Sequence, residues 1–228
     1  MVIPLYDHDP TDFKVRPYVT WSLIALNVIV FGVEQATGGG EFLMMFYGAV
    51  PAAILGQAPN PSPIPAWATL VTSMFLHNGW LHVGFNMLYL FVFGDDIEGA
   101  MGWWRFLLFY MASGILAGLA HVACNLDSVG PMIGASGAIA GVLAAYLMLR
   151  PCAKLWVLVF FRPVRIAAMW AIGLWVALQL YDILSGEDDE VAYAAHFGGL
   201  LAGALLFFLL CPRDVELFEC IEEEPTPP

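Results

Sequence analysis

The sequence predicts an all-α polytopic membrane protein with six transmembrane helices and with its N- and C-termini in the cytoplasm. Of its 228 residues, 60% are hydrophobic and 12% are charged, a composition that water-soluble domains do not have. Six apolar runs approach the roughly 20 residues that a helix needs to cross a bilayer. The basic residues, which are retained on the cytoplasmic side of membrane proteins, follow the pattern that six crossings require.

The chain is expected to consist of one membrane domain and two short flanking segments. Residues 1–17 form a cytoplasmic N-terminal segment, residues 18–210 the six-span domain, and residues 211–228 an acidic cytoplasmic tail. The first run is not a cleavable signal peptide, because it is long, rich in bulky aromatic residues and lacks a small-residue cleavage pattern after it. The predicted spans cover about 18–36, 78–97, 103–123, 134–150, 164–184 and 193–210.

The eight basic residues determine the predicted orientation. They lie before the first span, between the second and third, between the fourth and fifth, and after the sixth. With the N-terminus inside and six crossings, all of them fall on the cytoplasmic side. A five-span or seven-span chain would move part of this set outside. The residues are Lys14, Arg16, Arg105, Arg150, Lys154, Arg162, Arg165 and Arg213.

A long outer connection, about 37–77, follows the first span. Its two apolar pieces, "EFLMMFYGAVPAAILG" and "AWATLVTSMFLHNG", are too short to cross the bilayer, and the intervening "QAPNPSPIP" breaks any helix. We expect these pieces to lie in the outer interface of the membrane, with Phe42, Phe46, Tyr47 and Trp67 as anchors.

Charge and cysteine content exclude two further features. The net charge of −12 comes largely from the acidic tail and the outer loop "GEDDE", and no basic cluster is concentrated enough to bind nucleic acid. Cys152, Cys211 and Cys220 map to the cytoplasmic side, and only Cys124 maps near the outer face. We therefore expect no structural disulfide.

Four polar side chains are placed at membrane depth, where a polar group is costly unless it has a partner or a function. His82 and Asn86 lie four residues apart on the second predicted span, on the same helix face. Ser136 lies at the start of the fourth span, and His196 at the start of the sixth. Because all three spans start at the outer side, these side chains converge if the spans are neighbours.

Small residues predict that the fourth and sixth spans touch. Gly137 and Gly141 lie in the fourth span, and Gly199 and Gly203 lie in the sixth, at the four-residue spacing that lets two helices approach closely. A serine–histidine pair needs that approach, since the serine oxygen must come within about 2.6–3.2 Å of the imidazole. The fourth span is also short, which predicts a pit that water could enter above Ser136.

Three short motifs occur in order on these spans: "HVGFN" on the second, "GASG" on the fourth and "HFGG" on the sixth. A further motif, "EGAMGWWR", contains Glu98, Gly102 and Arg105. Together they resemble the rhomboid intramembrane serine proteases, whose patterns are HxxxN, GxSG, HxxG and ExxxGxxR. His77 matches a histidine often found at the outer start of the second span in that family. The resemblance covers nearly the whole chain and implies the six-helix rhomboid-like fold.

The resemblance also implies a role for each residue. Ser136 would be the nucleophile and His196 its general base and acid, cleaving transmembrane helices of membrane proteins near their outer end. His82, Asn86 and the Ser136 backbone N–H would stabilise the oxyanion. Because Asp182 and Glu190 bracket an outer loop, no acid orients His196 and the pair is a dyad. No cofactor or metal is implied. The glycines expected to pack around the site are Gly134, Gly137, Gly141, Gly199 and Gly203.

Two positions depart from the family pattern. The residue four after the serine, often a tyrosine that stacks on the histidine, is Ala140 here, so other contacts must orient His196. The Trp-Arg pair sometimes seen in the first outer loop is not matched, since Ala68 follows Trp67. Neither change removes a reacting group.

Three other functions compete with proteolysis. A metal or haem site could use His77, His82 and His196, but there is no HExxH pair and no carboxylate beside these histidines. A non-catalytic relative could bind transmembrane clients, although such relatives usually lack the serine or the histidine. A transporter would need a charged relay or an inverted repeat, and neither is visible.

The expected partners are the lipid bilayer and transmembrane substrates that enter from the lipid. The outer loop "SGEDDEV" and the adjoining fifth span are candidates for a mobile gate, because the loop is polar, contains glycine and directly precedes the sixth span. The minimal six-span form without a transit peptide favours the plasma membrane of a prokaryote, with the active site opening to the outer side.

Overall fold

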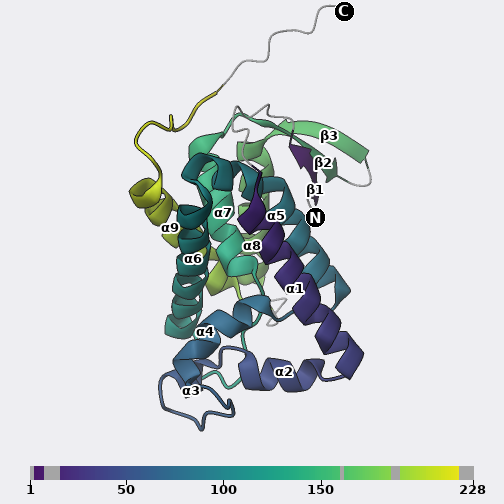
Figure 1. The fold of residues 1–228 in the computed structure, drawn as a ribbon, viewed down its shortest axis with the longest axis vertical. Helices are drawn as coiled ribbons and strands as arrows, with labels where there is room; N and C mark the ends of the chain where they lie inside the picture. Colours follow the sequence, from purple (N-terminus) through teal and green to yellow (C-terminus); the bar gives the residue numbers. More distant parts are fainter. Residues whose placement is uncertain (1–2, 8–15, 160–161, 186–190, 221–228) are drawn as a thin grey trace, which may run out of the picture.

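The structure, a computed structural model, describes residues 3–7, 16–159, 162–185 and 191–220, and it is mostly helical (Figure 1). Short 3₁₀ turns at Ala66–Ala68 and Ser73–Phe75 flank α4. The helices are α1 (Tyr18–Thr37), α2 (Gly40–Tyr47), α3 (Pro51–Ile54), α4 (Thr69–Thr72), α5 (Trp80–Met101), α6 (Trp103–Cys124), α7 (Ser136–Leu149), α8 (Ala168–Ser185) and α9 (Tyr193–Leu210), and the strands are β1 (Ile3–Asp7), β2 (Lys154–Val159) and β3 (Arg162–Ala167).

Among the described residues, four helices are long and apolar enough to cross a membrane: α1, α6, α8 and α9. The central helix α7 is apolar but has 14 residues, about 21 Å at the helical rise. Helix α5 has 22 residues and carries three acidic side chains, Asp95, Asp96 and Glu98, near its C-terminal end. Four spans are therefore supported by length and composition, and the count of six and the orientation of the termini stay predictions.

The bundle is arranged around α7, because α7 consists of small and apolar residues that neighbouring helices can bury. Every residue from Gly137 to Tyr146 is buried. Gly199 and Gly203 of α9 pack against the backbone of Gly137 and Gly141, with no room for a side chain at either α9 position. The predicted contact between these two segments is confirmed, and it rests on the expected glycines.

Helix α6 covers α7 from another side, and this second use of the small residues was not predicted. A Cβ atom at Gly137 would lie 2.7 Å from the Ala117 Cβ, and one at Gly141 would lie 2.8 Å from the Ser113 side chain. The α7 glycines therefore let two helices, α6 and α9, approach at once.

Glu98 joins α5 to the beginning of α1. Its carboxylate accepts hydrogen bonds from the backbone N–H groups of Val19 and Thr20, at 2.9 and 2.7 Å, and from the Thr20 hydroxyl at 2.8 Å. These N–H groups lie in the first turn of a helix, where they have no intrahelical acceptor and where a negative charge is favourable. The motif around Glu98 is thus a structural clamp between two helices.

A three-stranded antiparallel sheet corrects the all-α prediction. The strands pair in the order β1–β2–β3 at the end of the bundle opposite α2, α3 and α4 (Figure 1). Leu155 and Val157 are fully buried while Lys154 and Trp156 are exposed, the alternation that a half-buried strand requires. The predicted fifth span began at 164 and so included part of β3, whose apolar residues were counted as membrane helix.

A disulfide joins Cys152 to Cys220, so the prediction of no structural disulfide is wrong. The Cα atoms of these residues are 5.1 Å apart. The tail reaches Cys152 because its backbone satisfies the end of α7: the Phe218 N–H donates to the Met148 carbonyl at 2.7 Å. The last carbonyls of a helix lack intrahelical donors, so a neighbouring chain segment can supply them. The prediction failed because it considered only a pair of cysteines at the outer face, whereas the bonded pair lies at the other end of the bundle.

Candidate active site

Ser136 is the first residue of α7, and the extended segment before it is held by the long connection that follows α1. Ala49 and Met132 exchange two backbone hydrogen bonds of 2.9 Å, and the Gly134 N–H donates to the Ser73 carbonyl at 2.8 Å. The residues between α1 and α5 thus position the approach to the serine, which is a role that the sequence did not indicate.

Gly134 corrects one of the packing assignments. It lies before α7 with φ +112°, a conformation that side chains disfavour, and not at a helix–helix contact. A Cβ atom there would lie 2.7 Å from His82 Nε2 and 3.7 Å from Asn86 Nδ2. The absent side chain lets these two nitrogens approach the backbone beside Ser136.

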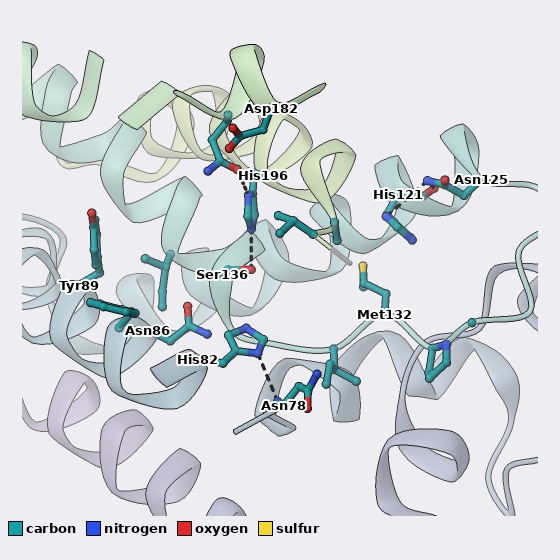
Figure 2. Close-up of a pocket in the computed structure, with 18 of the residues that line it drawn as sticks. Asn78, His82, Asn86, Tyr89, His121, Asn125, Met132, Ser136, Asp182 and His196 are labelled. Carbon is teal, nitrogen blue, oxygen red and sulfur yellow. Dashed lines mark hydrogen bonds between the residues drawn. The ribbon is translucent and has the colours of Figure 1, made fainter. Parts of the chain in front are cut away.

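Ser136 and His196 form a hydrogen-bonded pair. The distance from Ser136 Oγ to His196 Nε2 is 2.8 Å, and on its other side His196 Nδ1 lies 2.7 Å from Gln179 Oε1 (Figure 2). An amide oxygen can only accept, so His196 Nδ1 carries the proton and donates it. His196 Nε2 is then the acceptor for the serine O–H, which is the tautomer a general base needs.

Aromatic rings complete the surroundings of His196. The Trp175 ring centroid is 5.6 Å from that of His196, and the Tyr193 ring meets it edge-on at 6.5 Å. These rings, together with Gln179, supply the contacts that the small Ala140 cannot. Gln179 was missed because it belongs to a span with no recognisable motif, although it lies one helical turn after Trp175 on the same face.

His82 and Asn86 present N–H groups beside the serine. The Asn78 backbone N–H donates to His82 Nδ1 at 3.2 Å, so His82 Nε2 carries the proton and is a donor toward Gly134. Asn86 is buried, and its Nδ2 has no hydrogen-bond partner among the described residues. A buried donor without an acceptor is costly, which suggests that its acceptor is a bound molecule.

These side chains line one cavity of about 1000 Å³ (Figure 2). Its walls come from α5, α7, α8 and α9, with contributions from α2, from the end of α6 and from the segment between α6 and α7. The four predicted residues are all in its lining. The lining also contains polar residues that the sequence did not single out for the site, among them Asn78, Gln179 and Asp182.

His77 lies behind the cavity and does not line it. Its ring centroid is 5.0 Å from that of His82. Burial, followed by the neighbouring His82, lowers the pKa of His77 to about 4, so this imidazole is neutral near pH 7. Within the described ranges, no group of three or more His, Cys, Asp or Glu residues is arranged to hold a metal ion. The site offers a nucleophile, a base and hydrogen-bond donors, and these groups can support acyl transfer.

Residues 65–213 match the sequence profile of the Rhomboid domain. The chain belongs to the rhomboid family. Several relatives in this family are named as proteases, and this chain is a membrane protein of the same family.

Relatives of this rhomboid protein include fungal and bacterial proteins. It is 32% identical over 213 residues to Rhomboid protein 1, mitochondrial, of Saccharomyces cerevisiae, covering 88% of this chain and 56% of the yeast protein. It is 30% identical over 154 residues to Rhomboid-type serine protease 2 of Emericella nidulans, covering 61% of this chain and 29% of that protein. It is 36% identical over 135 residues to Rhomboid protease GluP of Bacillus subtilis, covering 58% of this chain and 24% of that protein. The chain thus spans about half of the yeast protein and less than a third of the other two.

Proposed function

We propose that this rhomboid protein is an intramembrane serine endopeptidase that uses Ser136 as the nucleophile and His196 as the general base. The observation that carries the proposal is the hydrogen-bonded series from Gln179 Oε1 to His196 Nδ1, and from His196 Nε2 to Ser136 Oγ, at 2.7 and 2.8 Å. This arrangement directs the lone pair of His196 Nε2 at the hydroxyl proton of Ser136.

Peptide cleavage follows in two steps. Ser136 Oγ attacks the carbonyl carbon of the peptide bond while His196 Nε2 takes the hydroxyl proton, giving a tetrahedral intermediate. His196 returns that proton to the amide nitrogen, the C–N bond breaks, and the new amine leaves. In the second step His196 takes a proton from water, the hydroxide attacks the acyl carbon, and Ser136 is released with its proton restored.

The negative oxygen of each intermediate needs donors that are already in place. His82 Nε2–H and Asn86 Nδ2 lie beside Gly134, two residues before Ser136 in the chain. The Ser136 backbone N–H is in the first turn of α7, where the helix dipole favours a negative charge. We assign these three groups to the oxyanion, where losing one donor costs about 10²–10³ in kcat.

We infer that the substrates are transmembrane helices, cleaved near their outer end. The cavity is at the end of the bundle that carries α2 and α3, which the predicted topology places outside. The yeast relative is named mitochondrial and another relative is bacterial, so the comparisons do not distinguish between these membranes. The plasma membrane of a prokaryote remains the proposal made from the sequence.

Purified protein tests the dyad directly. Wild type, Ser136→Ala and His196→Ala are incubated in detergent with a model transmembrane substrate, and a fluorophosphonate probe reports the reactivity of the serine. Ser22→Ala, which changes an exposed serine on α1, is the control and should match wild type. Each dyad variant should lose at least about 10³-fold in cleavage rate.

Two outcomes would contradict the proposal. Cleavage that persists in either dyad variant means that another residue supplies the nucleophile or the base. Wild type that binds the substrate but neither cleaves it nor reacts with the probe would instead be a non-catalytic binder of transmembrane clients.

A further inference from the structure

We propose that Gln179 is a positioning residue for the dyad: from the loosely packed outer half of α8, it selects the tautomer of His196 and holds the ring toward Ser136. The inference rests on the proposed function. It links the position of one helix to the reactivity of a serine that lies on another.

The hydrogen bond to Gln179 accounts for the tautomer of His196. A neutral imidazole has one N–H, and only the form with the proton on Nδ1 leaves Nε2 free to accept from Ser136. The Gln179 Oε1 lies 2.7 Å from His196 Nδ1, and this acceptor stabilises the competent form. The neutral amide takes the orienting part that a carboxylate takes in serine proteases with a triad.

The half of α8 that carries Gln179 is weakly packed against the bundle. All 18 residues of α8 are described, and the buried ones are Ala168, Ala171 and Ile172, in its first turns. Only 17% of the α8 span is buried, compared with 44% of the α6 span. The outer half of α8 therefore has little contact area to hold it against the bundle.

Two side chains on the cavity-facing side of α8 contact His196. Trp175 and Gln179 are one turn apart, and the first places its ring near His196 while the second bonds to Nδ1. Displacing the outer half of α8 would separate Gln179 from His196. A dyad with α8 displaced would then be less reactive than one with α8 in the observed position.

Two substitutions of equal length separate hydrogen bonding from packing. Gln179→Met keeps the length and apolar stem of the side chain but has no comparable acceptor, whereas Gln179→Glu keeps an acceptor oxygen in the same place. Leu180→Met, at an exposed neighbouring position on α8, is the control. Cleavage of a short soluble peptide is measured, so that entry of a transmembrane helix does not limit the rate.

The expected result is a separation of kcat from KM. Gln179→Met should lower kcat by about 10- to 100-fold with little change in KM. The His196 ring loses the hydrogen bond that orients it, whereas the contacts with substrate are unchanged. The kcat of Gln179→Glu should stay within about fivefold of wild type, since a carboxylate also accepts a hydrogen bond from Nδ1–H. Equal activity of Gln179→Met and wild type would overturn the proposal, as would equal losses in both variants.

Nitrogen NMR of histidine-labelled protein gives a readout that does not need cleavage or a stable variant. In the wild-type protein at neutral pH, the His196 signals should show a protonated Nδ1 and a non-protonated Nε2. Observing the proton on Nε2 would overturn the proposal. The same spectra of Ser136→Ala separate this result from the proposed function. A Nδ1–H signal in that variant supports the positioning role of Gln179 without the serine. If the wild-type protein also fails to cleave substrate, the positioning role stands and the protease proposal is rejected.

Discussion

At the residue scale, Gly134 shows how a single missing side chain organises the site. From the sequence it belonged to a set of packing glycines, and four of those five do lie at helix contacts. Gly134 differs because its φ of +112° and the nearby His82 Nε2 leave no room for a methyl group. The missing side chain leaves space for His82 Nε2 and Asn86 Nδ2 beside the backbone. A count of small residues does not distinguish this role from helix packing.

Gly134→Ala should therefore impair activity. The new Cβ would meet His82 Nε2 at 2.7 Å, so the ring would move away from the position assigned to the oxyanion. We expect kcat to fall about 10²- to 10³-fold, the range for loss of one such donor. The measurement is cleavage of the model transmembrane substrate by folded protein.

Gly84→Ala is the matched control for that substitution. Gly84 lies on α5, and a Cβ atom there meets nothing within 4 Å. Alanine is favoured over glycine inside a helix, so this variant should keep its activity and gain about 0.5–1 kcal/mol of stability. Unchanged activity in Gly134→Ala would show that His82 does not act from its observed position.

At the element scale, the helices were predicted more accurately than the connections between them. The start of α7 at Ser136 lies within two residues of the predicted start at 134, because small apolar residues mark it clearly. The sheet was missed because β2 was assigned to the basic link before the predicted fifth span and most of β3 to that span, and the alternation of buried and exposed residues appears only once the strands pair. Of the predicted gate loop, residues 186–190 lie outside the described residues, and α8 remains the testable part.

Joining α5 to α8 across the cavity should block transmembrane substrates selectively. Phe85 and Leu178 both line the cavity, one on each helix. Cysteines at these positions, in a background where the free Cys124 and Cys211 are replaced, can be linked by a bifunctional maleimide. We expect cleavage of a transmembrane substrate to fall at least about tenfold, because a lateral entrance must open for it.

The linked protein should keep its reactive serine. Labelling of Ser136 by a small fluorophosphonate is expected to stay within about twofold, since the probe enters from water and the observed position of α8 keeps Gln179 on His196. The double cysteine variant without the reagent is the control. Full cleavage of the transmembrane substrate by the linked protein would exclude α8 as the gate.

At the scale of the whole molecule, one end of the bundle holds the candidate site and the other holds the sheet and residues 211–220. The sheet and residues 211–220 lie together at the end opposite α2 and α3 (Figure 1). There the tail covers the end of α7, the Arg150 guanidinium lies 3.5 Å from the Glu219 carboxylate, and Cys152 is bonded to Cys220. The helix that begins with Ser136 is thus held at both of its ends by other segments.

Breaking the disulfide should destabilise the protein as a whole. The bond joins residues 68 positions apart, and closing a loop of that size is worth about 4 kcal/mol of unfolding free energy. Reduction by dithiothreitol should lower the stability of wild type by that amount, measured by denaturant unfolding in detergent. Cys152→Ser should be equally unstable and indifferent to the reductant.

A free cysteine provides the comparison. Cys211→Ser leaves the disulfide intact, so this variant should respond to dithiothreitol as wild type does. Wild-type protein that is indifferent to the reductant would show that the bond is absent in solution.

The amino-acid order was sufficient to predict a membrane protein, the main helices and the proximity of Ser136 to His196, because apolar length and motif spacing can be read from the chain alone. It could not reveal Gln179 beside His196, the clearance at Gly134, the sheet, or the bond from Cys152 to Cys220. Each of these joins segments distant in sequence, and none has a periodicity or motif of its own. Such contacts exist only after the helices have packed, when geometry, and not composition, determines which side chains meet.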